Sequence, residues 1–277
     1  MTEPLTGRVA IVTGGARGIG RAAAAQLAGL GMAVAICDRD HERGLRTAAE
    51  LDDHARVRFF PMDLAEPEQI ERAVADVEAA FGPADTLVNN AAQIGEPRPL
   101  LELGLEAWRQ VMDVNLTGTF LISQAVARRL VKAGRGGVIV NIQAIQPKLP
   151  LAGYTPYCVS KGGLDAFTRV LAVELAPAGI RVNGIAVGSV FADSMKPLLP
   201  EGPEWQGEID PEHPPTGLDE SAGTLIGRMG RPSDIARVVG FLVSDDAAYL
   251  TGSVIRADGG RLISRRPDPL APGGRPR

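Results

Sequence analysis

The sequence predicts an α/β fold: one domain built on a doubly wound parallel sheet of about seven strands with helices on both faces. Short apolar runs rich in β-branched residues alternate with longer helical patterns, as in parallel strands joined by crossover helices. Only 4% of the 277 residues are aromatic while Gly numbers 33, so the core must consist of small aliphatic side chains packed closely. The chain is long enough to bury such a core.

Each predicted element follows from local periodicity. Runs typical of buried strands occupy residues 9–12, 33–37, 57–60, 86–88, 138–142, 181–186 and 253–256. Helical periodicity covers residues 21–30, 42–51, 67–81, 105–131, 156–175 and 233–243. Right-handed crossovers between parallel strands then place helices on both faces of the sheet.

Two segments depart from this alternation. Residues 189–227 include a long stretch rich in Pro, Gly and acidic residues, which we interpret as a lid or loop over a substrate. Residues 261–277 hold four prolines and are expected to form a disordered tail.

Charge and composition exclude several classes of function. The net charge is −4, and the tail holds five arginines against one aspartate, so residues 1–260 carry −8; such a body is a poor partner for nucleic acid. No apolar run approaches the ~20 residues of a membrane span, and the N-terminus has no signal-peptide pattern. Cys37 and Cys158 fit neither a disulfide framework nor a metal site. We therefore expect no nucleic-acid partner, no membrane partner and no metal. The expected location is the reducing cytoplasm.

A glycine-rich turn follows the first predicted strand. Gly14, Gly18 and Gly20 have the spacing G-x-x-x-G-x-G, with Arg17 and Ile19 between them, and a helix begins there. Such a turn lets backbone N–H groups approach a pyrophosphate while the helix dipole favours its charge. A tight turn that merely needs positive φ values is the alternative.

The second predicted strand ends at Asp38, eighteen residues after Gly20. A carboxylate at this place accepts hydrogen bonds from the adenosine ribose and repels a 2′-phosphate, which favours NAD over NADP. The adjacent Arg39 weakens this preference, and a solvated acid at a strand end is the alternative interpretation.

Further motifs in order along residues 5–260 resemble the short-chain dehydrogenase/reductase family. The motifs that carry the resemblance are the glycine turn, Asp63-Leu64, Asn89-Asn90-Ala91-Ala92, Asn115 in V-N-L-T-G, Tyr157-Cys158-Val159-Ser160-Lys161, Arg228-Met229-Gly230-Arg231-Pro232, and Leu250-Thr251-Gly252 with Asp258-Gly259-Gly260. The resemblance implies a Rossmann-type fold, a dinucleotide-binding and catalytic domain over residues 1–260, and assembly as a homo-oligomer, a tetramer or dimer.

The resemblance also implies roles for single residues. Tyr157, Lys161 and Asn115 would be catalytic, with Lys161 also on the nicotinamide ribose and Asn115 holding a water that relays protons. Asp63, Leu64 and Asn90 would line the adenosine side of the cofactor, and Val190 would reach the nicotinamide through its backbone. For Asn89 a structural role, tying one strand end to its neighbour, is the expectation.

Tyr157 and Lys161 lie four residues apart at the start of a predicted helix, with Thr155 as its expected N-cap, so both side chains share one face. The pKa of a tyrosine is ordinarily near 10, and a neighbouring ammonium and the oxidised nicotinamide both favour its phenolate form. Tyr157 would then remove the hydroxyl proton of an alcohol as hydride leaves, or donate it in reduction.

Ala144 is the main departure from the family pattern, because it stands where a serine hydroxyl contacts the substrate oxygen, thirteen residues before Tyr157. Gln143, Gln146 and Tyr154 are candidate replacements and hence candidate substrate contacts. Two alternatives are that the substrate itself supplies a hydroxyl and that the protein binds cofactor without efficient turnover. Ala192 also replaces a threonine that holds the carboxamide, a role that Ser194 could take.

Two functions remain open on the sequence. The first is an NAD(H)-dependent oxidoreductase that interconverts a secondary alcohol and a ketone, with Tyr157 as general acid/base. The second is a catalytically impaired dinucleotide-binding scaffold or regulator of the same fold, suggested by Ala144 and Ala192.

Overall fold

The computed structural model describes residues 5–52, 56–191, 210, 212–213 and 223–264. They form one seven-stranded sheet in the order β3-β2-β1-β4-β5-β6-β7, and every strand pair is parallel. The strands are β1 (Val9–Thr13), β2 (Ala33–Asp38), β3 (Val57–Pro61), β4 (Thr86–Asn89), β5 (Gly137–Ala144), β6 (Ile180–Val187) and β7 (Val254–Ala257). The predicted fold class is confirmed.

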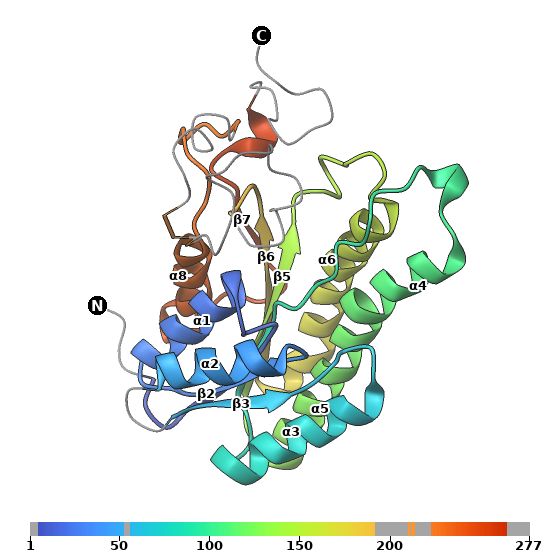
Figure 1. The fold of residues 1–277 in the computed structure, drawn as a ribbon. Coiled ribbons are helices and arrows are strands. Elements are labelled where there is room, and N and C mark those ends of the chain that lie inside the picture. Colours follow the sequence, from blue (N-terminus) through green and yellow to red (C-terminus); the bar gives the residue numbers. More distant parts are fainter. Residues whose placement is uncertain (1–4, 53–55, 192–209, 211, 214–222, 265–277) are drawn as a thin grey trace.

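Helices cover both faces of the sheet (Figure 1). Helices α1 (Gly18–Gly29), α2 (His41–Leu51) and α8 (Pro232–Val243) lie on one face, and α3 (Pro67–Phe81), α4 (Leu105–Met112), α5 (Thr119–Lys132) and α6 (Thr155–Leu175) on the other. Each face buries its own aliphatic cluster. The inner strands are accordingly buried on both sides, which explains their almost continuous apolar runs, whereas the edge strands β3 and β7 are partly exposed.

The helix predicted over residues 105–131 is interrupted. A π-helical turn, Asp113–Gly118, separates α4 from α5. Gly118 packs directly on the third crossover, because a Cβ at this position would lie 2.4 Å from the carbonyl oxygen of Leu64. The wider turn, which contains Asn115, is therefore the shape that fits α4 and α5 against the sheet.

The two irregular segments are described only in part. Of the predicted lid, residues 192–209, 211 and 214–222 lie outside the described residues, as do Ala192 and Ser194. The predicted tail starts too early: Arg261–Ile263 form a short 3-10 helix, Arg261 is buried, and residues 265–277 lie outside the description. In the described part of the chain no helix is long and apolar enough to cross a membrane.

Candidate active site

The glycine turn lies at the carboxyl end of β1, where the strand order reverses between β2 and β4. Gly14 and Gly18 have φ values of +63° and +53°. A Cβ on Gly20 would lie 2.1 Å from the carbonyl oxygen of Gly14, and a Cβ on Gly14 would lie 2.8 Å from the Cα of Ala91. The turn thus needs glycine for both backbone conformation and close approach.

Asn90 fastens this turn to the end of β4. Its Nδ2 donates to the carbonyl oxygens of Thr13 and Gly14 at 2.9 and 3.1 Å, and its backbone N–H donates to the Thr13 hydroxyl at 2.9 Å. The side chain predicted to line the adenosine therefore shapes the cradle through its amide nitrogen. Helix α1 starts directly after Arg17, which is exposed and extended, and Ile19 packs against the core.

The carboxylate of Asp38 is held beside the same turn. Its Oδ2 accepts from the backbone N–H of Ala16 at 3.1 Å, and its Oδ1 accepts from the N–H of Asp40 at 3.0 Å. Asp38 is half-buried at the end of β2, whereas Arg39 is exposed. The acid is therefore fixed next to the cradle rather than free in solvent.

The remaining adenosine-side residues take different positions. Asp63 accepts from the N–H of Ala65 at 2.9 Å in the turn after β3, and Leu64 is buried in the core. Asn89 has the structural role expected of it, because its Nδ2 donates to Ser123 at 2.9 Å and to Asn141 at 2.8 Å.

Tyr157 and Lys161 lie in the first two turns of α6. This helix begins at Thr155, so its N-cap is Tyr154 and not the predicted Thr155, and no side-chain hydrogen bond caps it. The Nζ of Lys161 lies 5.9 Å from the centroid of the Tyr157 ring and donates to the carbonyl oxygen of Ile142 at 2.9 Å. Both residues thus share one face of α6 next to β5.

Burial dominates the acid–base properties of this pair. It lowers the pKa of Lys161, which is 3% exposed, to about 8. Burial, with a contribution from the neighbouring Cys158, raises the pKa of Tyr157 to about 12. The expectation that Lys161 lowers the pKa of Tyr157 is therefore not met in the chain alone. Loss of hydration disfavours the phenolate by more than the nearby ammonium favours it.

Asn115 lies in the π-helical turn and is 1% exposed. Its Oδ1 accepts from the N–H of Gln93 at 2.7 Å, and its Nδ2 donates to the carbonyl oxygen of Gln93 at 2.9 Å and to the hydroxyl of Ser160 at 3.0 Å. The structure thus brings Asn115 to the helix that carries Tyr157 and Lys161. Ser160 was not predicted as a site residue.

The candidate substrate contacts are corrected at one position. Gln143 is 3% exposed and donates to the Thr168 hydroxyl on α6 at 2.9 Å, so its side chain belongs to the core. It is wrong as a substitute for the missing serine, because consecutive strand residues face opposite sides of the sheet. Ala144 is buried at the end of β5, while Gln146 and Tyr154 are half-buried in the following segment.

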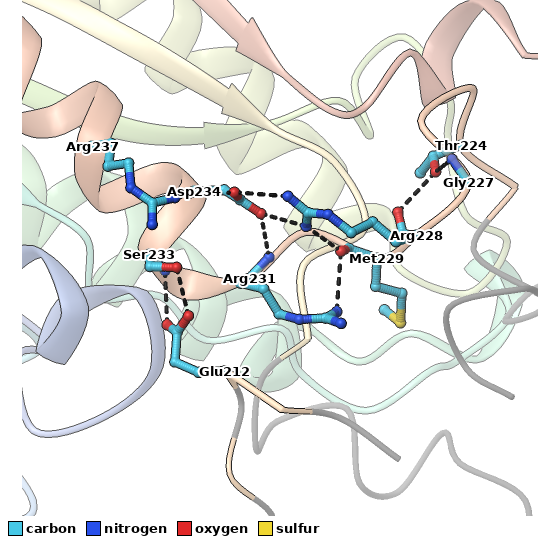
Figure 2. Close-up of polar contacts among 9 residues, drawn as sticks. All are labelled: Glu212, Thr224, Gly227, Arg228, Met229, Arg231, Ser233, Asp234 and Arg237. Atoms are coloured by element: carbon cyan, nitrogen blue, oxygen red, sulfur yellow. Dashed lines mark hydrogen bonds and ion pairs between the residues drawn. The ribbon is translucent and has the colours of Figure 1, made fainter. Parts of the chain in front are cut away.

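The start of α8 lies beside residues 224–231, the segment that precedes it (Figure 2). Val190 is buried and bridges Gly230. Arg228 binds Asp234 with distances of 2.6 and 2.9 Å, and both carboxylate oxygens of Glu212 accept from Ser233, at 2.8 Å from its N–H and 2.5 Å from its hydroxyl. An acid of the predicted lid is therefore attached to the helix, which no sequence motif indicated.

No cluster of three or more His, Cys, Asp or Glu side chains suited to a metal occurs among the described residues.

Comparisons with known proteins identify relatives over almost the whole chain. The family model described as enoyl-(acyl carrier protein) reductase matches residues 14–261. The short-chain reductase protein NovJ of Streptomyces niveus is 38% identical over 254 residues, 91% of this chain and 93% of that protein. The 3-oxoacyl-(acyl-carrier-protein) reductase FabG of Aquifex aeolicus is 37% identical over 262 residues, 94% of this chain and 99% of that protein.

A solved structure extends the likeness to three dimensions. The 3-ketoacyl-(acyl-carrier-protein) reductase of Brucella melitensis, complexed with NADH, matches with a TM-score of 0.81 and 27% identity, over 93% of this chain and 99% of that one. Sequence motifs, sheet order, site geometry and relatives all lead to the same conclusion: this chain belongs to the short-chain dehydrogenase/reductase family of oxidoreductases.

Proposed function

We propose that the protein is an NAD(H)-dependent oxidoreductase that interconverts a secondary alcohol and a ketone, with Tyr157 as general acid/base. The observation that carries the proposal is the convergence of Tyr157, Lys161 and Asn115 from α6 and the π-helical turn. Lys161 is held by the Ile142 carbonyl, and the Asn115 amide is held by Gln93 and Ser160.

The residues at the carboxyl ends of β1 and β2 fit a dinucleotide. The cradle has no room for a Cβ at Gly14 or Gly20, and α1 begins there with free backbone N–H groups. The Asp38 carboxylate, fixed beside Ala16, would accept from the ribose hydroxyls and disfavour a 2′-phosphate. Arg17, Ile19, Asp63, Leu64, Asn90 and Val190 complete the proposed cofactor contacts.

NAD(H), when bound, supplies the acceptor or donor of hydride. The Oη of Tyr157 takes the proton of the substrate hydroxyl in oxidation and returns it to the carbonyl oxygen in reduction. Because burial raises the pKa of Tyr157 to about 12, the chain alone keeps this proton at neutral pH and is prepared to act as an acid. Lys161 holds a nearby positive charge that favours the phenolate, and Asn115 binds the same helix through the Ser160 hydroxyl.

Ala144 supports a second candidate, a scaffold that binds the dinucleotide without efficient turnover. A methyl group cannot donate to the substrate oxygen, and loss of one such donor costs on the order of 10²–10³ in rate in other enzymes. We favour the enzyme because Tyr157, Lys161 and Asn115 are all present. Gln146 and Tyr154 are the side chains proposed to contact a small alcohol or ketone substrate.

A homo-oligomer is the proposed form of the protein. Exposed apolar side chains on α5 and α6, Phe120, Val170 and Val173, are 42%, 51% and 77% exposed in the single chain. Such a surface is suited to a second copy of the chain.

The decisive experiment screens secondary alcohols with NAD and ketones with NADH, reading nicotinamide absorbance. Turnover that disappears in Tyr157→Phe supports the enzyme. Dinucleotide binding without turnover across the panel supports the scaffold. Ala144→Ser should keep activity if another group has replaced the hydroxyl; loss of turnover in that variant would mean that the substrate needs the methyl group.

A further inference from the structure

Ser160 lies between Tyr157 and Lys161 on α6, and none of the roles above uses it. Its side chain is completely buried. The hydroxyl accepts from Asn115 Nδ2 at 3.0 Å and donates to the carbonyl oxygen of Tyr157 at 2.8 Å. A single hydroxyl therefore joins the π-helical turn to the backbone of the residue proposed to move the proton.

The Asn115 side of this link has little freedom. The amide binds both backbone groups of Gln93, which follows β4, and spends its second Nδ2 hydrogen on Ser160. The backbone oxygen of Asn115 accepts from the Thr119 hydroxyl at 3.0 Å. The segment that follows β4 thus fixes Asn115 through Gln93, and Asn115 in turn fixes Ser160.

The two segments are also in close steric contact. A Cβ on Gly163, one turn after Ser160, would lie 3.0 Å from Leu116 Cδ2. At the N-terminus of α6, no side chain caps the N–H groups of the first turn. The Ser160 hydroxyl therefore ties an uncapped turn, the one carrying Tyr157, to a neighbour that is itself fixed.

We propose that Ser160 is a positioning residue, which sets the place of the Tyr157 phenol and the Lys161 ammonium by coupling α6 to Asn115. The proposal rests on the proposed function, because it assigns Ser160 to the same proton-transfer site. It goes beyond burial of a helix, since it predicts an effect on Tyr157 that depends on Asn115.

The test compares Ser160→Ala with Ser123→Ala. Ser123 on α5 is an equally buried serine whose hydroxyl accepts from an asparagine amide, that of Asn89 at 2.9 Å. Both substitutions leave one buried amide hydrogen without its acceptor, so both should lower thermal stability to a similar extent. Of these two serines, only Ser160 contacts the backbone of Tyr157.

The first readouts do not depend on turnover. The protein has three tyrosines, and ultraviolet difference titration against a Tyr157→Phe sample isolates the Tyr157 ionisation. We expect the pKa of Tyr157 to change in Ser160→Ala and to remain at its wild-type value in Ser123→Ala. Amide hydrogen exchange over residues 113–118 should rise about tenfold or more in Ser160→Ala alone, because the π-helical turn loses its contact with α6.

The kinetic readout follows on an active substrate pair. Ser160→Ala should lower kcat on the order of 10- to 10²-fold and raise KM for NAD by a smaller factor, since it displaces the proton-transfer groups and Lys161 is also expected on the nicotinamide ribose. In an Asn115→Ala background the same substitution should change kcat by less than about twofold, because the coupled partner is already gone.

The outcomes are distinguishable. Equal kcat, tyrosine titration and hydrogen exchange in Ser160→Ala and Ser123→Ala overturn the positioning role while leaving the proposed function intact. Full additivity with Asn115→Ala also overturns it. A wild-type protein that binds NAD but never turns over removes the proposed function, and the inference falls with it.

Discussion

Replacing Lys161 with methionine should stabilise the protein while removing its proposed activity. Burial lowers the pKa of Lys161 from 10.5 to about 8, so folding disfavours the ammonium form. Since one pKa unit corresponds to about 1.4 kcal/mol, the charged side chain costs about 3 kcal/mol at pH 7. Methionine has nearly the same length and no charge, so Lys161→Met should raise the free energy of unfolding by that order.

The pH dependence gives this prediction its sharpest form. Between pH 8 and 10.5 the unfolded chain binds more protons at Lys161 than the folded chain, so the wild type gains stability as pH rises. Below pH 8 both forms are protonated and the full cost remains. The advantage of Lys161→Met should therefore fall from about 3 kcal/mol at pH 7 to about 1 kcal/mol at pH 10.

Urea denaturation at several pH values and equal protein concentration measures this difference. Lys148→Met is the matched control, because Lys148 is exposed, and it should change stability by less than about 0.5 kcal/mol at each pH. A Lys161→Met protein that is less stable than wild type at pH 7, or an advantage that does not shrink with pH, would refute the reasoning.

Three further substitutions test other parts of the structure. Gly20→Ala should abolish NAD binding in calorimetry, because its Cβ would lie 2.1 Å from the Gly14 oxygen; binding within threefold of wild type would contradict the cradle. Asp38→Ala should raise the preference for NADP relative to NAD by about 10²-fold, since a like-charge contact costs several kcal/mol, and an unchanged ratio of kcat/KM values would count against the ribose role. Asp85→Asn should lower the free energy of unfolding by about 2 kcal/mol, because Asp85 is 4% exposed and binds Arg8 at 3.1 Å; a change below 0.5 kcal/mol would contradict it.

The sheet and the glycine turn after β1 were predictable because their signals are local. Strands buried on both faces give apolar runs, and all seven were located within two residues or so of their ends in the structure. The turn at Gly14, Gly18 and Gly20 follows from backbone sterics, because only glycine fits these positions, and the spacing of the glycines is visible in the sequence. Asp38, at the end of β2, was likewise located by the short strand pattern that precedes it.

The π-helical turn could not be read from periodicity. Residues 105–131 keep a helical pattern throughout, since one wider turn shifts the apolar face too little to alter it. The available signal was Gly118, a poor helix former in the helix interior. Its cause lies in a distant segment, because the Leu64 carbonyl leaves no room for a side chain.

Gln143 shows a second limit of the sequence. Counting residues back from Tyr157 identified a position on β5 but not the face to which its neighbour points. In the structure Gln143 joins Asn141 at the Thr168 hydroxyl, within a buried polar group between β5 and α6. A polar residue near a reacting centre in sequence is therefore a weaker indication of substrate contact than its strand parity.

The acid–base pair shows why motif and chemistry must be separated. The spacing of Tyr157 and Lys161 correctly places both on one face of α6, yet spacing carries no information about desolvation. Burial holds the pKa of Tyr157 near 12 and that of Lys161 near 8, so the chain alone neither forms a phenolate at neutral pH nor keeps its ammonium cheaply. A structural lysine at this position would gain from substitution by an apolar side chain. The charge, bound to the Ile142 carbonyl beside the Tyr157 ring, is therefore an energetic cost that the proposed proton transfer would explain.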